Sequence, residues 1–138
     1  MKSRLTVLLI LMLVAITSGC GTPTVDHIAI RDAYEAAIEA GDLDEALALF
    51  ADDALIVAPI GYWRGKEEIR EYLELELDVF LQGVPFGERL NVEETEDTLN
   101  FDERFPSPDG TTAQLHHAYI FENDRIKKWN ISDFHTVE

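Results

Sequence analysis

The sequence is poor in cysteine and in basic side chains. Cys20 is the only cysteine among 138 residues, so no disulfide can form within the chain. Lysine and arginine number 11 against 27 aspartate and glutamate residues, which gives a net charge of −16 at pH 7. Such an acidic excess repels the phosphates of nucleic acids and the anionic headgroups of membranes. We therefore expect no nucleic acid partner and no direct adsorption of the folded domain to a membrane surface.

Several motifs of catalysis and cofactor binding are also absent from the sequence. There is no G-x-S-x-G pattern for a serine hydrolase, and no G-x-G-x-x-G or Walker pattern for a nucleotide. His116 and His117 are adjacent, so on a strand they point to opposite faces and cannot share a metal. Asp133 and His135 are spaced for one face but have no third ligand. The sequence thus predicts no cofactor and no metal.

The first nineteen residues have the pattern of a bacterial export signal. Lys2 and Arg4 precede a short apolar run, Leu5 to Ile16, which is too short to span a bilayer comfortably and fits a signal peptide. The alternative is an uncleaved anchor helix. The ending Thr17-Ser18-Gly19-Cys20 resembles the lipobox of bacterial lipoproteins, although leucine is commoner at the first of these positions.

The lipobox resemblance implies cleavage before Cys20 and acylation of its sulfur and its new amino terminus. More than one acyl chain is what stable anchoring requires. We therefore divide the chain into a signal peptide (1–19), a lipidated tether (20–25) and a domain (26–138). The domain is expected in the cell envelope, outside the cytoplasm, held at the outer leaflet of the cytoplasmic membrane or at the outer membrane. Loss of Lys2 and Arg4 with the signal changes the net charge from −16 to −18.

Hydrophobic periodicity and turn residues predict helices in the first half of the domain and strands in the second. The expected helices are Asp26 to Ala40, Asp42 to Asp53 with a capping box at Asp42 and Glu45, and Lys66 to Leu81. The expected strands are Leu55–Ala58, Arg89–Thr98, Leu99–Phe105, Thr111–Phe121 and Arg125–Phe134, with a loop at Ile60–Gly65. On the first helix the buried stripe is predicted to be Ile30, Ala33, Tyr34, Ala37 and Ile38, with Arg31 outside it and His27 in solvent. This order of elements indicates an α+β domain.

The same order resembles a known family. The segments AGDLDEALALFADDALIVAP, GKEEIREYL and FENDRIKKWNISDF look like the SnoaL-like group of the nuclear-transport-factor-2-like (NTF2-like) superfamily. The resemblance implies a cone in which three N-terminal helices pack on a curved, mainly antiparallel sheet. It also implies an apolar pocket inside the cone and a homodimer formed through the sheet. It does not choose among the isomerases, cyclases, hydrolases and binding proteins of this superfamily.

The tight turn at Asn123-Asp124 predicts a register for the last hairpin. This register puts His116 opposite Ile131 and makes His116 and Asp133 diagonal neighbours, within side-chain reach. A bulge between them would undo the pairing. The residues sharing this face would be Gln114, His116, Ala118, Trp129, Ile131, Asp133 and His135. The opposite face carries more aliphatic and aromatic bulk, so the alternative is that it turns inward and leaves a polar cluster on the surface.

These residues define the predicted site. Asp133 and His116 are the predicted catalytic pair, because a carboxylate beside an imidazole can transfer protons. The predicted ligand-binding residues are Tyr34, Tyr62, Trp63, Gln114 and Trp129; the alternative for the tryptophans is that they fill the core or a dimer contact.

The function predicted from the sequence is binding of a small apolar or amphipathic ligand in the cone of a lipid-anchored domain. Cofactor-free proton transfer of isomerase or cyclase type would be its catalytic form. The alternative is a non-catalytic interaction or assembly module of the cell envelope.

Overall fold

The computed structural model describes residues 25–137. The predicted signal peptide, Cys20 and most of the tether lie outside the described residues. The helices are α1 (His27–Glu39), α2 (Leu43–Ala48) and α3 (Gly65–Leu81). The strands are β1 (Phe50–Ala58), β2 (Gly61–Arg64), β3 (Glu88–Glu94), β4 (Thr98–Pro106), β5 (Thr112–Glu122) and β6 (Arg125–Val137). Within residues 25–137, no helix combines the length and apolar character needed to cross a bilayer.

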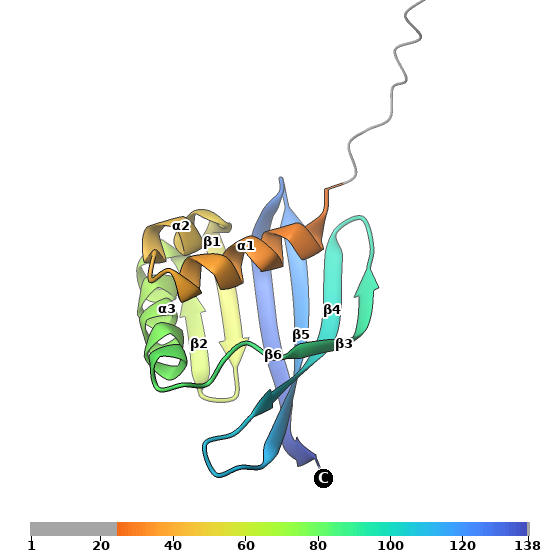
Figure 1. Ribbon diagram of the computed structural model, residues 1–138. Coiled ribbons are helices and arrows are strands. Elements are labelled where there is room, and N and C mark those ends of the chain that lie inside the picture. The colour runs from red at the N-terminus through yellow and green to blue at the C-terminus, as the bar shows by residue number, and fades with distance from the viewer. Residues whose placement is uncertain (1–24, 138) are drawn as a thin grey trace, which may run out of the picture.

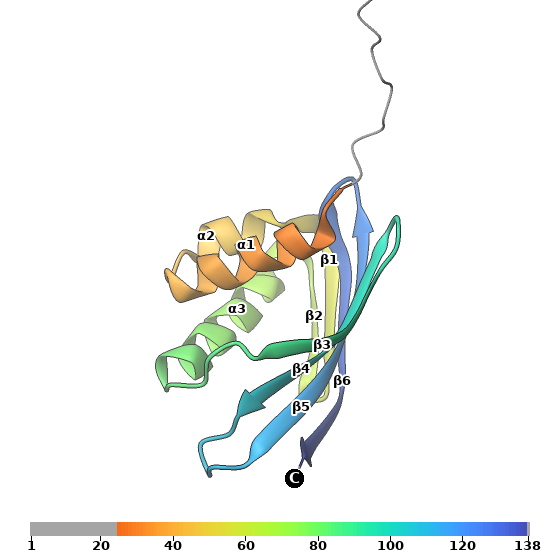
Figure 2. The same cartoon turned by 45° about the vertical axis from the view of Figure 1, so that its right-hand side comes forward.

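The strands form one curved, open sheet, and the helices lie along its concave side (Figures 1 and 2). The strand order is β2-β1-β6-β5-β4-β3, and β1 pairs with β6 in parallel while the other neighbours are antiparallel. The sheet is therefore mixed, with one parallel pairing. Trp129 and Tyr119 on the sheet and Tyr34 on α1 are at most 2% exposed, so the core lies between α1, α3 and the concave face.

The predicted helix boundaries are correct at α1 and wrong at α2. Asp26 caps α1 by accepting a hydrogen bond from Ala29 N, and Asp42 caps α2 by accepting one from Glu45 N. The structure ends α2 at Ala48, because Phe50 already belongs to β1 and pairs with β6. Tertiary pairing thus overrides the local helical pattern up to Asp53. The predicted loop at Ile60–Gly65 is largely strand β2, which pairs with β1.

The buried face of α1 is also rotated from the predicted one. Arg31 and His27, both predicted to be outside the core, are 1% and 2% exposed, whereas Ala33 is exposed. His27 stacks on Phe121 with ring centroids 4.0 Å apart. The face that meets the sheet therefore runs through His27, Arg31, Tyr34 and Ile38, each about one helical turn after the one before.

Two bulges correct the predicted register of the β5–β6 hairpin. Lys127 is an extra residue on β6, so Trp129 lies opposite Tyr119, and His116 lies opposite Ser132 rather than Ile131. A second shift falls at Asp133, whose φ of 54° is left-handed. Each bulge moves the residues beyond it to the opposite face. Trp129 and Ile131 consequently join the buried face, and the predicted neighbour relation of His116 and Asp133 is wrong.

Candidate functional site

A cavity of about 430 Å³ opens between α3, the loop after it and the ends of β4, β5 and β6. Its lining is mainly apolar and consists of Ala58, Pro59, Ile60, Tyr72, Leu75, Glu76, Val79, Phe80, Val84, Pro85, Phe86, Glu103, Phe105, Leu115, His117, Ile131 and Phe134. A pocket of this size is typical of small-molecule sites, in which a few polar groups orient the ligand. Here the ionisable groups in the lining, apart from the Tyr72 hydroxyl, are Glu76, Glu103 and His117.

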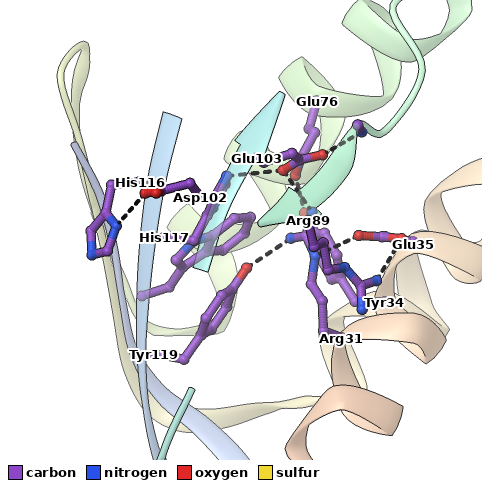
Figure 3. Close-up of polar contacts among 12 residues, drawn as sticks. Arg31, Tyr34, Glu35, Glu76, Arg89, Asp102, Glu103, His116, His117 and Tyr119 are labelled. Carbon is purple, nitrogen blue, oxygen red and sulfur yellow. Dashed lines mark hydrogen bonds and ion pairs between the residues drawn. The ribbon is translucent and has the colours of Figure 1, made fainter. Parts of the chain in front are cut away.

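Behind this cavity a buried arginine holds a polar network together (Figure 3). The Arg31 guanidinium donates to Glu35 Oε1 at 2.8 Å and to the Tyr119 hydroxyl at 2.7 Å, and its Nη2 lies 3.4 Å from Glu103 Oε2. The Cζ atom of Arg31 also lies over the rings of Tyr34 and Phe86, at 5.1 and 5.2 Å from their centroids. A buried charge requires such partners. Arg31 therefore ties α1 to the sheet through β4 and β5.

Glu103 on β4 is fixed from three directions. Gly87 N donates to its Oε1 at 2.6 Å, while His117 Nε2 and Arg31 Nη2 approach its Oε2 at 2.9 and 3.4 Å. A side chain at Gly87 would place its Cβ 2.0 Å from the carbonyl oxygen of Arg104, so only glycine allows this close approach of the chain to β4. The cavity wall thus contains a carboxylate whose two oxygens both have partners within the protein.

The tautomer of His117 follows from its second partner. Trp129 Nε1 donates to His117 Nδ1 at 3.1 Å, so Nδ1 carries no proton and the neutral ring holds its proton on Nε2, facing Glu103. Burial lowers the pKa of His117, which favours this neutral form at pH 7. Trp129 therefore orients the imidazole rather than contacting the cavity.

Glu76 on α3 has the opposite environment from Glu103. Its Oε2 accepts a hydrogen bond from the Tyr34 hydroxyl, and burial raises its pKa from 4.5 to about 7. Burial alone would also raise the pKa of Glu103, but the hydrogen bond from His117 and the charge of Arg31 hold that pKa at about 2. The cavity thus contains one carboxyl poised to gain or lose a proton near neutral pH and one that stays ionised.

Tyr72 lies one helical turn before Glu76 and also lines the cavity. Burial raises the pKa of Tyr72 well above 10, so the hydroxyl keeps its proton. Tyr72 can therefore supply a hydrogen-bond donor next to the acceptor oxygens of Glu76.

None of the seven residues predicted to bind a ligand or act in catalysis belongs to the cavity lining described above. Three of them support it from behind or beside. Tyr34 bonds to Glu76, Trp129 bonds to His117, and the ring of Trp63 packs on Tyr72 at 4.8 Å between centroids. For these three, the structure shows contacts with lining residues.

The other four lie away from the cavity lining. Tyr62 is 73% exposed, and Gln114 accepts a hydrogen bond from Arg104 Nε at 2.8 Å. His116 Nδ1 lies 2.9 Å from Asp102 Oδ1, on the side of the strands away from Arg31 (Figure 3). Asp133 is exposed in its bulge.

Arg31, Glu76, Glu103 and His117 were not predicted from the sequence as functional residues. A signal existed for Glu76, which follows the apolar residues Tyr72 and Leu73 by four and three positions and so falls on the same face of the predicted helix. Glutamate is seldom buried unless it is paired, so its position on an apolar helix face marks it as a candidate. Among the described residues, no three His, Cys, Asp or Glu side chains are arranged to hold a metal ion.

Comparison with solved structures places this fold among known ones. An NTF2-like protein of unknown function from Cytophaga hutchinsonii has a TM-score of 0.63 at 12% identity, covering 83% of this chain and 95% of that one. A SnoaL-like family member from Agrobacterium tumefaciens, named as a candidate isomerase, has a TM-score of 0.63 at 21% identity and covers 76% and 94%. TerC, co-crystallised with polyporic acid, has a TM-score of 0.60 at 18% identity and covers 76% and 88%. At these identities the likeness shows the fold alone.

Comparison with curated proteins found no match. A family model, however, covers residues 30–129, from α1 to the middle of β6, and its description is "SnoaL-like domain". This span contains most of α1, the other two helices, the first five strands and the three ionisable cavity residues Glu76, Glu103 and His117. The chain therefore belongs to the SnoaL-like domain family and has the NTF2-like α+β fold.

Proposed function

We propose that the domain binds a small, mainly apolar molecule in the cavity and that Glu76 exchanges a proton with it. The observation that carries this proposal is the presence of two carboxyl groups with opposite pKa displacements in one apolar cavity of about 430 Å³. Environments that push two such groups apart are typical of acid and base roles. Glu76 is the proton-transfer group, and Glu103 stays ionised against His117 Nε2 and Arg31.

The proposed chemistry needs no cofactor. The carboxylate of Glu76 removes a proton from carbon or oxygen of the bound molecule, and the Tyr72 hydroxyl donates a hydrogen bond to the negative charge that develops. Tyr34 positions Glu76 through its hydrogen bond. The candidate isomerase from Agrobacterium tumefaciens and the TerC complex with polyporic acid support this class of function, since they are structural neighbours named for an activity and a ligand.

Binding in the cavity predicts a simple result with a neutral apolar dye. N-phenyl-1-naphthylamine should bind the purified protein saturably and with increased fluorescence, because the cavity replaces water around its rings. Leu115→Trp fills part of the cavity from β5 and should weaken the dye at least about tenfold, a loss of about 1.4 kcal/mol. Ile120→Trp is the matched control, since Ile120 is on the same strand, 45% exposed and outside the lining. Absence of saturable binding to the unmodified protein would exclude the proposed function.

We also propose that the domain is a lipoprotein of the cell envelope, anchored through Cys20. The support is the order of basic, apolar and small residues before the chain's only cysteine. Mass spectrometry of the protein made in a bacterial host should then show a mature chain that starts at an acylated Cys20. Cys20→Ala should abolish acylation and recovery from the membrane fraction, whereas Thr22→Ala should change neither. An intact Met1 on the mature protein would contradict the proposal.

A further inference from the structure

We propose that the preferred occupant of the cavity is an apolar amine whose ammonium group pairs with Glu76. This inference rests on the proposed function, since it names the chemical class of the small molecule that the cavity takes. It follows from the contacts of the charged side chains in and around the cavity. Some of them already have a partner of opposite charge, and others do not.

Among residues 25–137, those that line the cavity include the carboxyl groups of Glu76 and Glu103 but no lysine or arginine. The nearest buried cation, Arg31, is already engaged by Glu35, Glu103 and Tyr119. Arg89 is engaged in turn by Asp32 at 2.7 Å and Glu35 at 2.8 Å. Neither guanidinium is thus available to a ligand anion in the cavity.

The two carboxyl groups of the lining differ in how they are satisfied. Glu103 has the guanidinium of Arg31, the imidazole of His117 and the backbone N–H of Gly87 around it. Glu76 has one polar contact, the neutral hydroxyl of Tyr34, and no basic side chain lies within ion-pair distance of it among the described residues. The charge of Arg31 acts on Glu76 only from beyond ion-pair distance, and burial still raises its pKa to about 7. A poorly solvated carboxylate without a direct cation partner is costly, so a cation from outside would find its partner here.

The walls beside Glu76 suit the rest of such a molecule. Phe80 and Phe86 stack with centroids 6.1 Å apart, and Tyr72 lies one turn from Glu76 on α3. Aromatic faces attract cations as well as apolar groups, and they already do so in this protein, where Arg31 lies over Phe86. A molecule with an aromatic or aliphatic body and one ammonium end would therefore meet complementary groups at both ends.

Anions of the same shape are expected to be repelled by the cavity. A carboxylate or phosphate would bring negative charge next to Glu76 and Glu103 without a free cation to offset it. The net charge of −16 also attracts cations to the protein and repels anions. The cavity is thus selective for charge as well as for size.

Three probes that share a phenylbutyl skeleton and differ in their terminal group test this selectivity. We suggest 4-phenylbutylamine, 4-phenylbutan-1-ol and 4-phenylbutanoate, titrated calorimetrically into the purified protein at pH 8, where Glu76 is ionised. The amine is expected to bind about tenfold more tightly than the alcohol, and the alcohol about tenfold more tightly than the carboxylate. Glu76→Gln should remove the advantage of the amine and leave the alcohol unchanged. Glu74→Gln is the matched control, because Glu74 is exposed on the same helix and outside the lining.

The outcomes separate the two proposals. Equal affinities for amine and alcohol would overturn the amine inference, and so would an advantage of the amine that survives in Glu76→Gln. In either case, binding of the alcohol would still support a small-molecule cavity. Binding of none of the three would overturn both. The expected order of affinities, lost in Glu76→Gln and kept in Glu74→Gln, supports both.

Discussion

Replacing Arg31 by methionine is expected to lower the free energy of unfolding by about 3–5 kcal/mol, the usual result of removing one partner from a buried ion pair. Methionine keeps most of the side-chain length but not the charge. Glu103, 4% exposed, and Glu35 would then lose the cation that lies between them, and Tyr119 would lose its donor. Urea denaturation monitored by tryptophan fluorescence measures the loss, since Trp129 is in the core beside this network.

Two further variants show whether charge is the cause. Arg31→Met combined with Glu103→Gln should be less destabilised than Arg31→Met alone, because the buried carboxylate left without its cation is gone. Arg125→Met, at an exposed position on β6, should change stability by no more than about 0.5 kcal/mol. If the Arg31 and Arg125 variants lost equal stability, the network around Arg31 would not hold the domain together as the contacts indicate.

The fold could be predicted from the sequence where local signals and tertiary structure agree. Asp26 and Asp42 cap helices where predicted, and Asn123 and Asp124 have the positive φ that a tight hairpin turn needs. Phe50 shows the limit of such reasoning. Its spacing fits a helix, but pairing with β6 makes it the first residue of a strand, and pairing partners far along the chain leave no local signal.

The site could be predicted much less well, for two physical reasons. A single extra residue such as Lys127 reverses the faces of a strand, so the register that placed His116 beside Asp133 failed at the first bulge. Burial of charge is also invisible locally. Arg31 resembles a surface residue in the sequence, and only the arrival of Glu103 from β4 and Tyr119 from β5 gives its guanidinium partners inside the core.

Replacing Glu76 by glutamine is expected to remove a loss of stability that the unmodified protein undergoes as the pH rises. The variant should therefore gain stability relative to the unmodified protein at higher pH. The pKa of Glu76 is raised from 4.5 to about 7 by burial, so the folded state binds this proton more tightly than the unfolded chain. That contribution to stability is full below pH 4.5 and is lost as the pH rises through 7. Since one pKa unit corresponds to 1.36 kcal/mol, the loss in the unmodified protein between pH 5 and pH 8 is at most about 3 kcal/mol. Glutamine does not titrate, so the variant lacks this loss.

The difference between the two proteins isolates Glu76 from the other titrating groups. The lowered pKa of His117 acts in the opposite direction, because its contribution grows as the pH rises towards 6.5, and the low pKa of Glu103 matters only in acid. Both groups are present in both proteins, so subtracting the two curves of unfolding free energy against pH removes them. Tyr34→Phe adds a directional test: it deletes a hydrogen bond that favours the ionised form of Glu76, so the midpoint of the pH-dependent loss should move upward. A difference curve that is flat from pH 5 to pH 8 would mean that Glu76 titrates like a solvated carboxyl, and it would remove the basis for assigning proton transfer to this residue.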